Sequence, residues 1–438
     1  MSVRSRRIRR QILALAALAV SALGLTVGLD GAPAAARTAA RNSLFNRPYY
    51  YPSVNGDTYF NTVAPDGGIL ATADDTHGAN NGCAIARDIA IVSMKGSSPD
   101  HLQASTVNCM ISFGVRGGGR SPDGCSWKTG GITRVGNVVY LAVARQLRRC
   151  SAGRSAHGLQ PSFDASIIAS TDGGHTWTNP WGVTGRQGSA PAWNPKAHRY
   201  RAMFAGQQFS APFFIQYGPG NTHTADGADK YLYAVSNDGY AYNGNYLHLA
   251  RVPINRALHR TAWRYYHGKI GGGGASWTTR NAGATRVLQV RRGLSQPSIQ
   301  YLPAFHRYLL TTFTYSRARS DFPNRTQTPF TRVRFYTAPH PWGPWTRKLD
   351  VGARRDIWCR RACSLTREPG DAVVNVGRPS DWLGFYDPCL VQKFVFSRAL
   401  RSQAILTSGD FRNQTRYRRE NLYRLHAIPF DLAALIRG

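Results

Sequence analysis

The sequence is short of acidic residues. Of its 438 residues only 23 are Asp or Glu, against 55 Lys or Arg, and the formal net charge is +32. Only two acids are glutamates, Glu368 and Glu420. A long charged coiled coil or helical bundle carries Glu and Lys on its exposed faces, so this composition argues against both. Almost any acid, base or metal ligand built from a carboxylate must therefore be an aspartate.

Long apolar runs are also scarce. The one clear run, residues 11–28, follows an arginine-rich start and precedes Ala34, Ala35 and Ala36. This order predicts an export signal over residues 1–36 and one mature domain over residues 37–438. A permanent membrane anchor is the alternative, and Arg9-Arg10 also fits a twin-arginine signal. No second apolar run follows, so we expect a secreted or cell-envelope protein with no transmembrane segment after cleavage.

The residues that are abundant favour short strands and turns. The chain has 44 Gly, 24 Pro and 11% aromatic residues, a composition typical of β-rich folds. An apolar strand at 138–143 is followed about 30 residues later by a second at 167–170, as expected for a repeating unit. Similar pairs are 200–204 with 233–236, 308–313 with 334–337 and 69–71 with 91–93, and a last unit lies near 394–396. About five such units predict an all-β, five-bladed β-propeller, with a six-bladed sialidase-like propeller as the alternative.

The cysteine count carries a separate prediction. Seven cysteines in an exported protein indicate disulfides, and the odd number leaves at least one thiol outside an intramolecular bond. Their pairing does not follow from the sequence. They fall into two groups, Cys83, Cys109, Cys125 and Cys150, and then Cys359, Cys363 and Cys389.

The sharpest motif runs from Ser170 to Trp177 and reads S-T-D-G-G-H-T-W. It predicts a tight turn in which Asp172 accepts backbone N–H bonds, Gly174 is left-handed and Trp177 packs against the sheet. The segment resembles the Asp-box of sialidases and related propellers. In that family the box lies at the periphery, so the resemblance implies a structural role for Asp172.

A wider resemblance covers most of the mature chain. The residues that carry it are 66–69, 74–75, 107–110, 126–128, 249–253, 263–268 and 342–345. They resemble a family of secreted bacterial propellers catalogued as domain of unknown function 4185, which is similar to five-bladed glycosidases. The resemblance implies hydrolysis of a furanose-rich or cell-wall polysaccharide such as arabinan. A non-catalytic propeller that binds glycan or the cell wall is the alternative.

Glycosidic cleavage usually needs two carboxylates, one protonated and one ionised. The catalytic candidates are Asp57, Asp74 and Asp75, which surround the strand of the first unit. Adjacent residues of a strand point to opposite faces, so only one of Asp74 and Asp75 is expected to face a ligand.

Glu368 is a weaker candidate, because its neighbour Arg367 suggests a surface ion pair. Asp57, Asp74 and Asp75 could instead all serve turns or bind Ca²⁺. The glutamate that acts as general acid in related arabinan-cleaving enzymes has no early or mid-chain counterpart.

The remaining predictions concern ligands. Four aromatic residues in or beside loops rich in Gly, Asn and Ser are candidate substrate-binding residues: Trp127, Phe213, Tyr217 and Tyr240. Histidine spacing predicts no metal site and we expect no cofactor, although aspartate-rich turns would permit Ca²⁺ in an axial channel. The basic charge predicts a polysaccharide or anionic cell-envelope glycan as partner. The export signal and the scattered arginines argue against nucleic acid.

Overall fold

The computed structural model describes most of the chain from residue 44 onward. It covers residues 44–437 except 47–48, 117–120, 147–160, 180–189, 198, 208, 224, 239–243, 270–273, 316–330, 353–385, 396–401 and 409–422. The predicted signal segment 1–36 lies outside the described residues, and its boundary stays a prediction.

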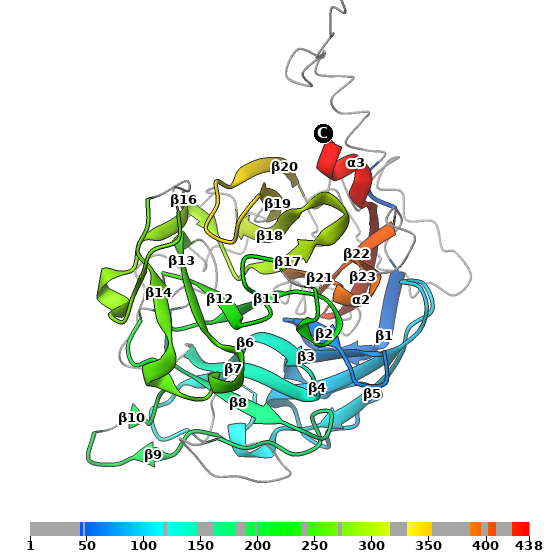
Figure 1. The fold of residues 1–438 in the computed structure, drawn as a ribbon. Helices are drawn as coiled ribbons and strands as arrows, with labels where there is room; N and C mark the ends of the chain where they lie inside the picture. Colours follow the sequence, from blue (N-terminus) through cyan, green and yellow to red (C-terminus); the bar gives the residue numbers. More distant parts are fainter. Residues whose placement is uncertain are drawn as a thin grey trace, which may run out of the picture.

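The described strands form five blades of antiparallel strands around a common centre (Figure 1), and the innermost strands of blades 3 and 4 also pair with each other in parallel. Blade 1 contains β2 (Asn61–Val63), β3 (Ile69–Thr76), β4 (Arg87–Lys95) and β5 (Gln103–Asn108). Blade 2 contains β6 (Ser126–Val135), β7 (Val138–Gln146) and β8 (Ser162–Ser170). Blade 3 contains β11 (Phe213–Gln216), β12 (Tyr231–Asn237) and β13 (Gly244–Pro253), and outside them β14 (Arg264–Tyr266), β15 (Trp277–Thr278) and β16 (Arg286–Leu294). Blade 4 contains β17 (Ser298–Leu302), β18 (Arg307–Tyr315), β19 (Thr331–Ala338) and β20 (Thr346–Gly352).

Blade 5 joins the two ends of the chain. It contains β21 (Tyr386–Leu390), β22 (Ser402–Ser408), β23 (Arg424–Asp431) and, at its outer edge, β1 (Tyr49–Asn55). Pairing of β1 with β23 therefore closes the ring, and in Figure 1 the blue strand β1 lies beside the orange and red strands. Two short helices, α2 (Gln392–Val395) and α3 (Leu432–Arg437), accompany this blade. The fold is a five-bladed β-propeller, which confirms the prediction over its six-bladed alternative.

Two of the predicted repeat units were misplaced. The segment around Trp193 and Tyr200 forms only a two-stranded hairpin, β9 (Trp193–Asn194) with β10 (Arg199–Tyr200). The corresponding strand of blade 3 is instead β12. The segment near Phe394 belongs to helix α2, and the corresponding strand of blade 5 is β22. The three other units coincide with β3, β7 and β18 of blades 1, 2 and 4.

The blades pack through apolar side chains, and their central strands are buried on both faces. β7 is buried at all but its first residue, and Phe60 of blade 1 lies 5.0 Å, between ring centroids, from Phe213 of blade 3.

The turn after β8 has the predicted geometry. Asp172 Oδ1 accepts a hydrogen bond from Thr176 N at 2.8 Å, Gly174 has a φ of 97°, and Trp177 is fully buried. Among the described residues, no helix is long and apolar enough to cross a membrane.

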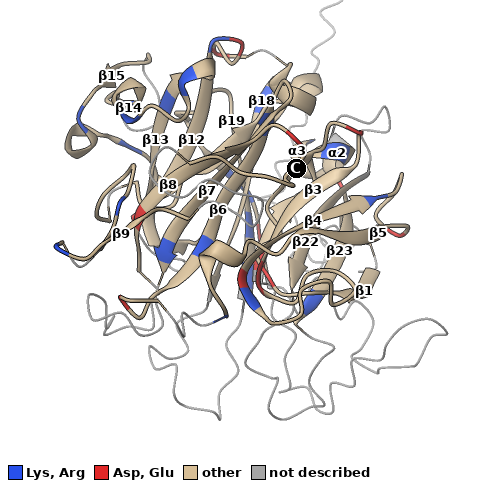
Figure 2. Cartoon of the chain, turned by 90° about the horizontal axis from the view of Figure 1, so that it is seen from below, with Lys and Arg blue, Asp and Glu red and all other residues tan. Residues whose placement is uncertain are grey.

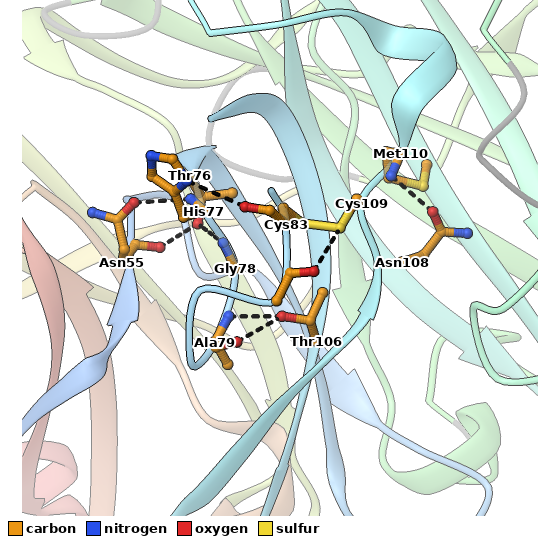
Figure 3. Close-up of a disulfide and its surroundings, with 11 residues drawn as sticks. Asn55, Thr76, His77, Gly78, Ala79, Cys83, Thr106, Asn108, Cys109 and Met110 are labelled. Carbon is orange, nitrogen blue, oxygen red and sulfur yellow. Dashed lines mark hydrogen bonds between the residues drawn. A yellow bond between two sulfur atoms is a disulfide. The ribbon is translucent and has the colours of Figure 1, made fainter. Parts of the chain in front are cut away.

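A disulfide fixes the outer part of blade 1 (Figure 3). Cys83 and Cys109 are joined across 26 residues, with Cα atoms 5.6 Å apart. The bond ties the loop that follows β3 to the end of β5, and Asn55 Oδ1 accepts a hydrogen bond from His77 N of that loop at 2.9 Å. Cys389 is a free, buried thiol, in agreement with the odd cysteine count.

Candidate functional site

The candidate site lies at the end of the propeller where the innermost strands begin. Asp57 precedes β2, Lys128 lies near the start of β6, and Asp387 lies near the start of β21. Because the strands of a blade are antiparallel, the end of β3, with Asp74 and Asp75, reaches the same level. Three blades thus contribute charged side chains to one cluster. Figure 2 shows basic and acidic segments side by side near the centre of the view, among basic positions spread over many strands.

The backbone places Asp57 beside Asp74. The two residues form an isolated antiparallel bridge, with N–O distances of 3.1 and 2.8 Å. Gly56 makes this approach possible, because it has a φ of 113° and a Cβ there would lie 2.5 Å from Asp74 O. The Asp57 carboxylate accepts hydrogen bonds from Thr58 Oγ1 at 2.8 Å and from the Tyr423 hydroxyl.

Asp74 and Asp75 both bind residues of β6, but in different ways. Asp74 is sealed from solvent and accepts bonds from Thr129 N at 3.0 Å and Thr129 Oγ1 at 3.1 Å. Asp75 forms an ion pair with Lys128 Nζ at 2.6 Å, and its side chain keeps 26% of its surface exposed. Its φ of 49° interrupts the regular strand, so the simple alternation of faces does not describe this pair. Of the two, only Asp75 offers a partly exposed carboxylate.

The site perturbs the protonation of its members. Burial raises the pKa of Asp57 to about 6, against the opposing effects of Lys128 and of the hydrogen bonds from Tyr423 and Thr58. Burial also raises the pKa of Asp74 well above its usual range. For Lys128, burial alone would lower the pKa, but the nearby carboxylates, Asp75 first, raise it above its usual value. The cluster therefore combines a permanent cation with carboxyl groups that differ in proton affinity.

Asp387 is a member of the cluster that sequence reasoning missed. Thr58 Oγ1 lies 3.1 Å from Asp387 Oδ2, although the two residues are 329 positions apart. Burial, followed by repulsion from Asp57, raises the pKa of Asp387 well above its usual range. The available signal was its position: like Asp57 in blade 1, it is an aspartate near the start of an innermost strand. That position can be recognised only when the strands of blade 5 are assigned correctly. The sequence pattern had placed the last unit near residues 394–396, so the start of β21 was not identified.

Three of the four aromatic residues predicted to bind substrate are core residues. Trp127 is buried, with the Arg145 guanidinium 4.4 Å from its ring centroid. Phe213 and Tyr217 are buried too, and Tyr217 Oη lies 3.1 Å from Tyr308 Oη. A sugar ring stacks on an accessible aromatic face, which none of these three offers, so that prediction is corrected. Tyr240 lies outside the described residues.

The described part of the chain shows no group of three or more His, Cys, Asp or Glu side chains placed to hold a metal ion. Within the site, the positive charge among the carboxylates comes from Lys128. The weaker candidate Glu368 lies outside the described residues, so its predicted ion pair stays a prediction.

Comparison with known proteins gives structural neighbours only. No protein-family model matches the sequence, and no curated protein matches it either. Among solved structures, the chain is similar to the α-L-arabinofuranosidase PaAbf62A of Podospora anserina, which was solved with cellotriose (10% identity, TM-score 0.45, covering 89% of this chain and 98% of that one). It is also similar to the catalytic domain of a Coprinopsis cinerea GH62 α-L-arabinofuranosidase (10%, 0.46, 89% and 98%). A third neighbour is a GH43 endo-arabinanase from Bacillus licheniformis (10%, 0.38, 85% and 94%).

Proposed function

We propose that this protein is a glycoside hydrolase that acts on a furanose-rich or cell-wall polysaccharide. The observation that carries the proposal is the grouping of Asp57 and Asp75 around Lys128 at one end of the propeller. Asp57 has a pKa of about 6 because of its burial, and Asp75 is ion-paired at 2.6 Å. One carboxyl group that exchanges a proton near neutral pH and one that remains ionised are what glycosidic cleavage requires.

The two aspartates have distinct roles in this proposal. Protonated Asp57 donates its proton to the leaving glycosidic oxygen as the bond from the anomeric carbon to that oxygen breaks. Asp75, ion-paired with Lys128, acts either as the base that takes a proton from the attacking water or as the carboxylate that attacks the anomeric carbon. In both routes one water molecule is consumed, its proton restores Asp57 or is taken up by Asp75, and its hydroxyl ends on the anomeric carbon. The anomeric configuration of the product, followed by NMR, distinguishes the routes.

We further infer that the protein works outside the cytoplasm, on a cell-envelope or environmental glycan. The arginine-rich, apolar leader supports export, and the net charge of +28 that remains after removal of residues 1–36 supports adhesion to an anionic envelope.

A non-catalytic glycan-binding propeller is the second candidate, and the burial of the carboxylates favours it. Asp57, Asp74 and Asp387 are 5%, 1% and 1% exposed. A structural role for all three requires no substrate contact at all.

A hydrolysis assay separates the two candidates. The purified mature protein is incubated with arabinan, arabinogalactan and a sialoside panel, and released reducing sugar is measured. We expect the wild-type protein to release sugar from a furanose-rich substrate. In Asp57→Asn and in Asp75→Asn the rate of release should fall by at least about a hundredfold. Asp66→Asn is the matched control, because Asp66 is an exposed aspartate that pairs with Lys95 away from the cluster. Retained glycan binding without release from any substrate would contradict the enzyme, and unchanged turnover in both variants would contradict the site.

A further inference from the structure

One hydroxyl group lies between two carboxyl groups in the cluster. Thr58 Oγ1 is 2.8 Å from Asp57 Oδ1 and 3.1 Å from Asp387 Oδ2. Asp57 comes from blade 1 and Asp387 from blade 5, so this contact crosses the point at which the ring closes. All three residues are buried.

The number of hydrogens decides what this arrangement means. A threonine hydroxyl has one hydrogen, so it donates to only one of the two carboxyl oxygens. If both aspartates were ionised, the other contact would place two acceptor oxygens together with no hydrogen between them. The arrangement is satisfied when one carboxyl group carries a proton and donates it to Thr58 Oγ1.

We propose that Asp387 carries this proton: its carboxyl group donates to Thr58 Oγ1, which in turn donates to ionised Asp57. Asp57 is the better place for the negative charge, because it also accepts a hydrogen bond from the Tyr423 hydroxyl. Asp387 has poorer support, since its buried Oδ1 accepts no hydrogen bond from the described residues. The shorter contact, on the Asp57 side, agrees with this direction.

The surroundings of Asp387 favour its neutral form. The charged groups that act on it are Asp57 before β2, Asp74 on β3 and Lys128 on β6. On its own strand, the Cys389 thiol donates to the Asp387 carbonyl at 3.2 Å. From β17, which packs against the same strand, the contact is the uncharged Ser298 hydroxyl, which accepts a bond from Leu390 N. Burial, together with the carboxyl groups of Asp57 and Asp74 against one ammonium, therefore disfavours a further negative charge on Asp387.

This inference deepens the proposed hydrolysis and rests on it for its catalytic meaning. Asp387 acts through Thr58 as a positioning residue. While Asp387 is neutral, it adds no repulsion to Asp57, and the Thr58 hydroxyl remains free to stabilise the ionised form of Asp57. Ionised Asp387 would do the reverse and raise the pKa of Asp57 further. Proton transfer by Asp57 near neutral pH therefore depends on a proton held in the last blade.

Infrared spectroscopy tests the proton without any activity. Protonated carboxyl groups and carboxylates absorb in separate regions, and the protein is compared at pH 7 with Asp387→Asn. Asparagine tolerates the φ of 49° at this position and can donate to Thr58 Oγ1. We expect the variant to lose protonated-carboxyl absorption, whereas Asp66→Asn loses carboxylate absorption. Loss of carboxylate absorption in Asp387→Asn would overturn the proposal.

The pH profile tests the consequence for catalysis. In Asp387→Asn the limb of the profile that reports Asp57 should stay at its wild-type pH, because a neutral donor replaces a neutral donor. Thr58→Val should raise the pKa of Asp57 and move the corresponding limb of the profile to higher pH, and Thr58→Ser should restore it. A displaced limb in Asp387→Asn, or an unmoved limb in Thr58→Val, would overturn the proposal. If the wild-type protein proves inactive, the proposed function fails, and the infrared result alone decides the protonation of Asp387.

Discussion

Removal of the Cys83–Cys109 disulfide should destabilise the protein by about 3 to 4 kcal/mol. The perturbation is the double variant Cys83→Ser, Cys109→Ser, which leaves both positions small and polar. The bond closes a loop with a sequence separation of 26. The loop-closure relation for that length gives about 3.5 kcal/mol of unfolded-state entropy at 25 °C. Backbone bonds that hold the same loop, such as Cys83 N to His77 O at 3.0 Å, remain in the variant, so we expect weakened stability with the fold retained.

The assay is urea unfolding followed by tryptophan fluorescence, in parallel with Ser105→Ala as a control on β5. The Ser105 hydroxyl makes only an exposed contact with Ser93 Oγ at 2.8 Å, so its removal should change the free energy of unfolding by less than about 0.5 kcal/mol. The double variant should unfold at a clearly lower urea concentration, and the dependence of its free energy of unfolding on urea concentration should change little. A loss below about 1 kcal/mol would refute the argument from unfolded-chain entropy, and loss of the whole fold would show that the bond holds more than this loop.

Two further predictions concern the turn after β8 and the aspartate cluster. Asp172→Ala should lower the free energy of unfolding by about 1 to 3 kcal/mol, because Thr176 loses the acceptor for both its N–H and its hydroxyl. Urea unfolding measures this change. A parallel loss of hydrolytic activity would contradict a purely structural role for the turn. The pKa of Asp57 rises from 3.8 to about 6 on folding because of burial, so its contribution to stability is complete below about pH 4 and is lost as the pH rises through about 6. Asp57→Asn should therefore gain up to about 3 kcal/mol relative to wild type between pH 4 and pH 8; a difference in unfolding free energy that does not change with pH would refute this.

The architecture was largely predictable from local patterns. Strands such as β7 and β18 contain short apolar stretches, residues 138–144 and 308–310, and the repetition of such stretches predicts radial blades. The errors arose where the local pattern was weak. Innermost strand β11 has only four residues, whereas the aromatic and proline pattern around Trp193 is conspicuous but forms a short hairpin. Periodicity cannot distinguish such a hairpin from a blade strand.

The candidate site was predictable only in part. The shortage of acids directed attention to Asp57, Asp74 and Asp75, and the structure brings these three together. Loop composition misled the search for sugar-binding aromatic residues, because it does not show whether a side chain near a strand end is buried. Trp127 lies in such a region but is sealed by its neighbours.

The sequence by itself determined which chemical groups this protein has: few carboxylates, nearly all of them aspartates, on a chain of repeated short strands. Tertiary structure alone decided which of these groups meet. Tyr423 donates to Asp57 across 366 residues, and Thr58 lies beside Asp387 across 329. Both contacts exist because the first and last strands pair and close the ring. Protonation follows from the same closure, since burial in this cluster is the first cause of the raised pKa of Asp57, Asp74 and Asp387.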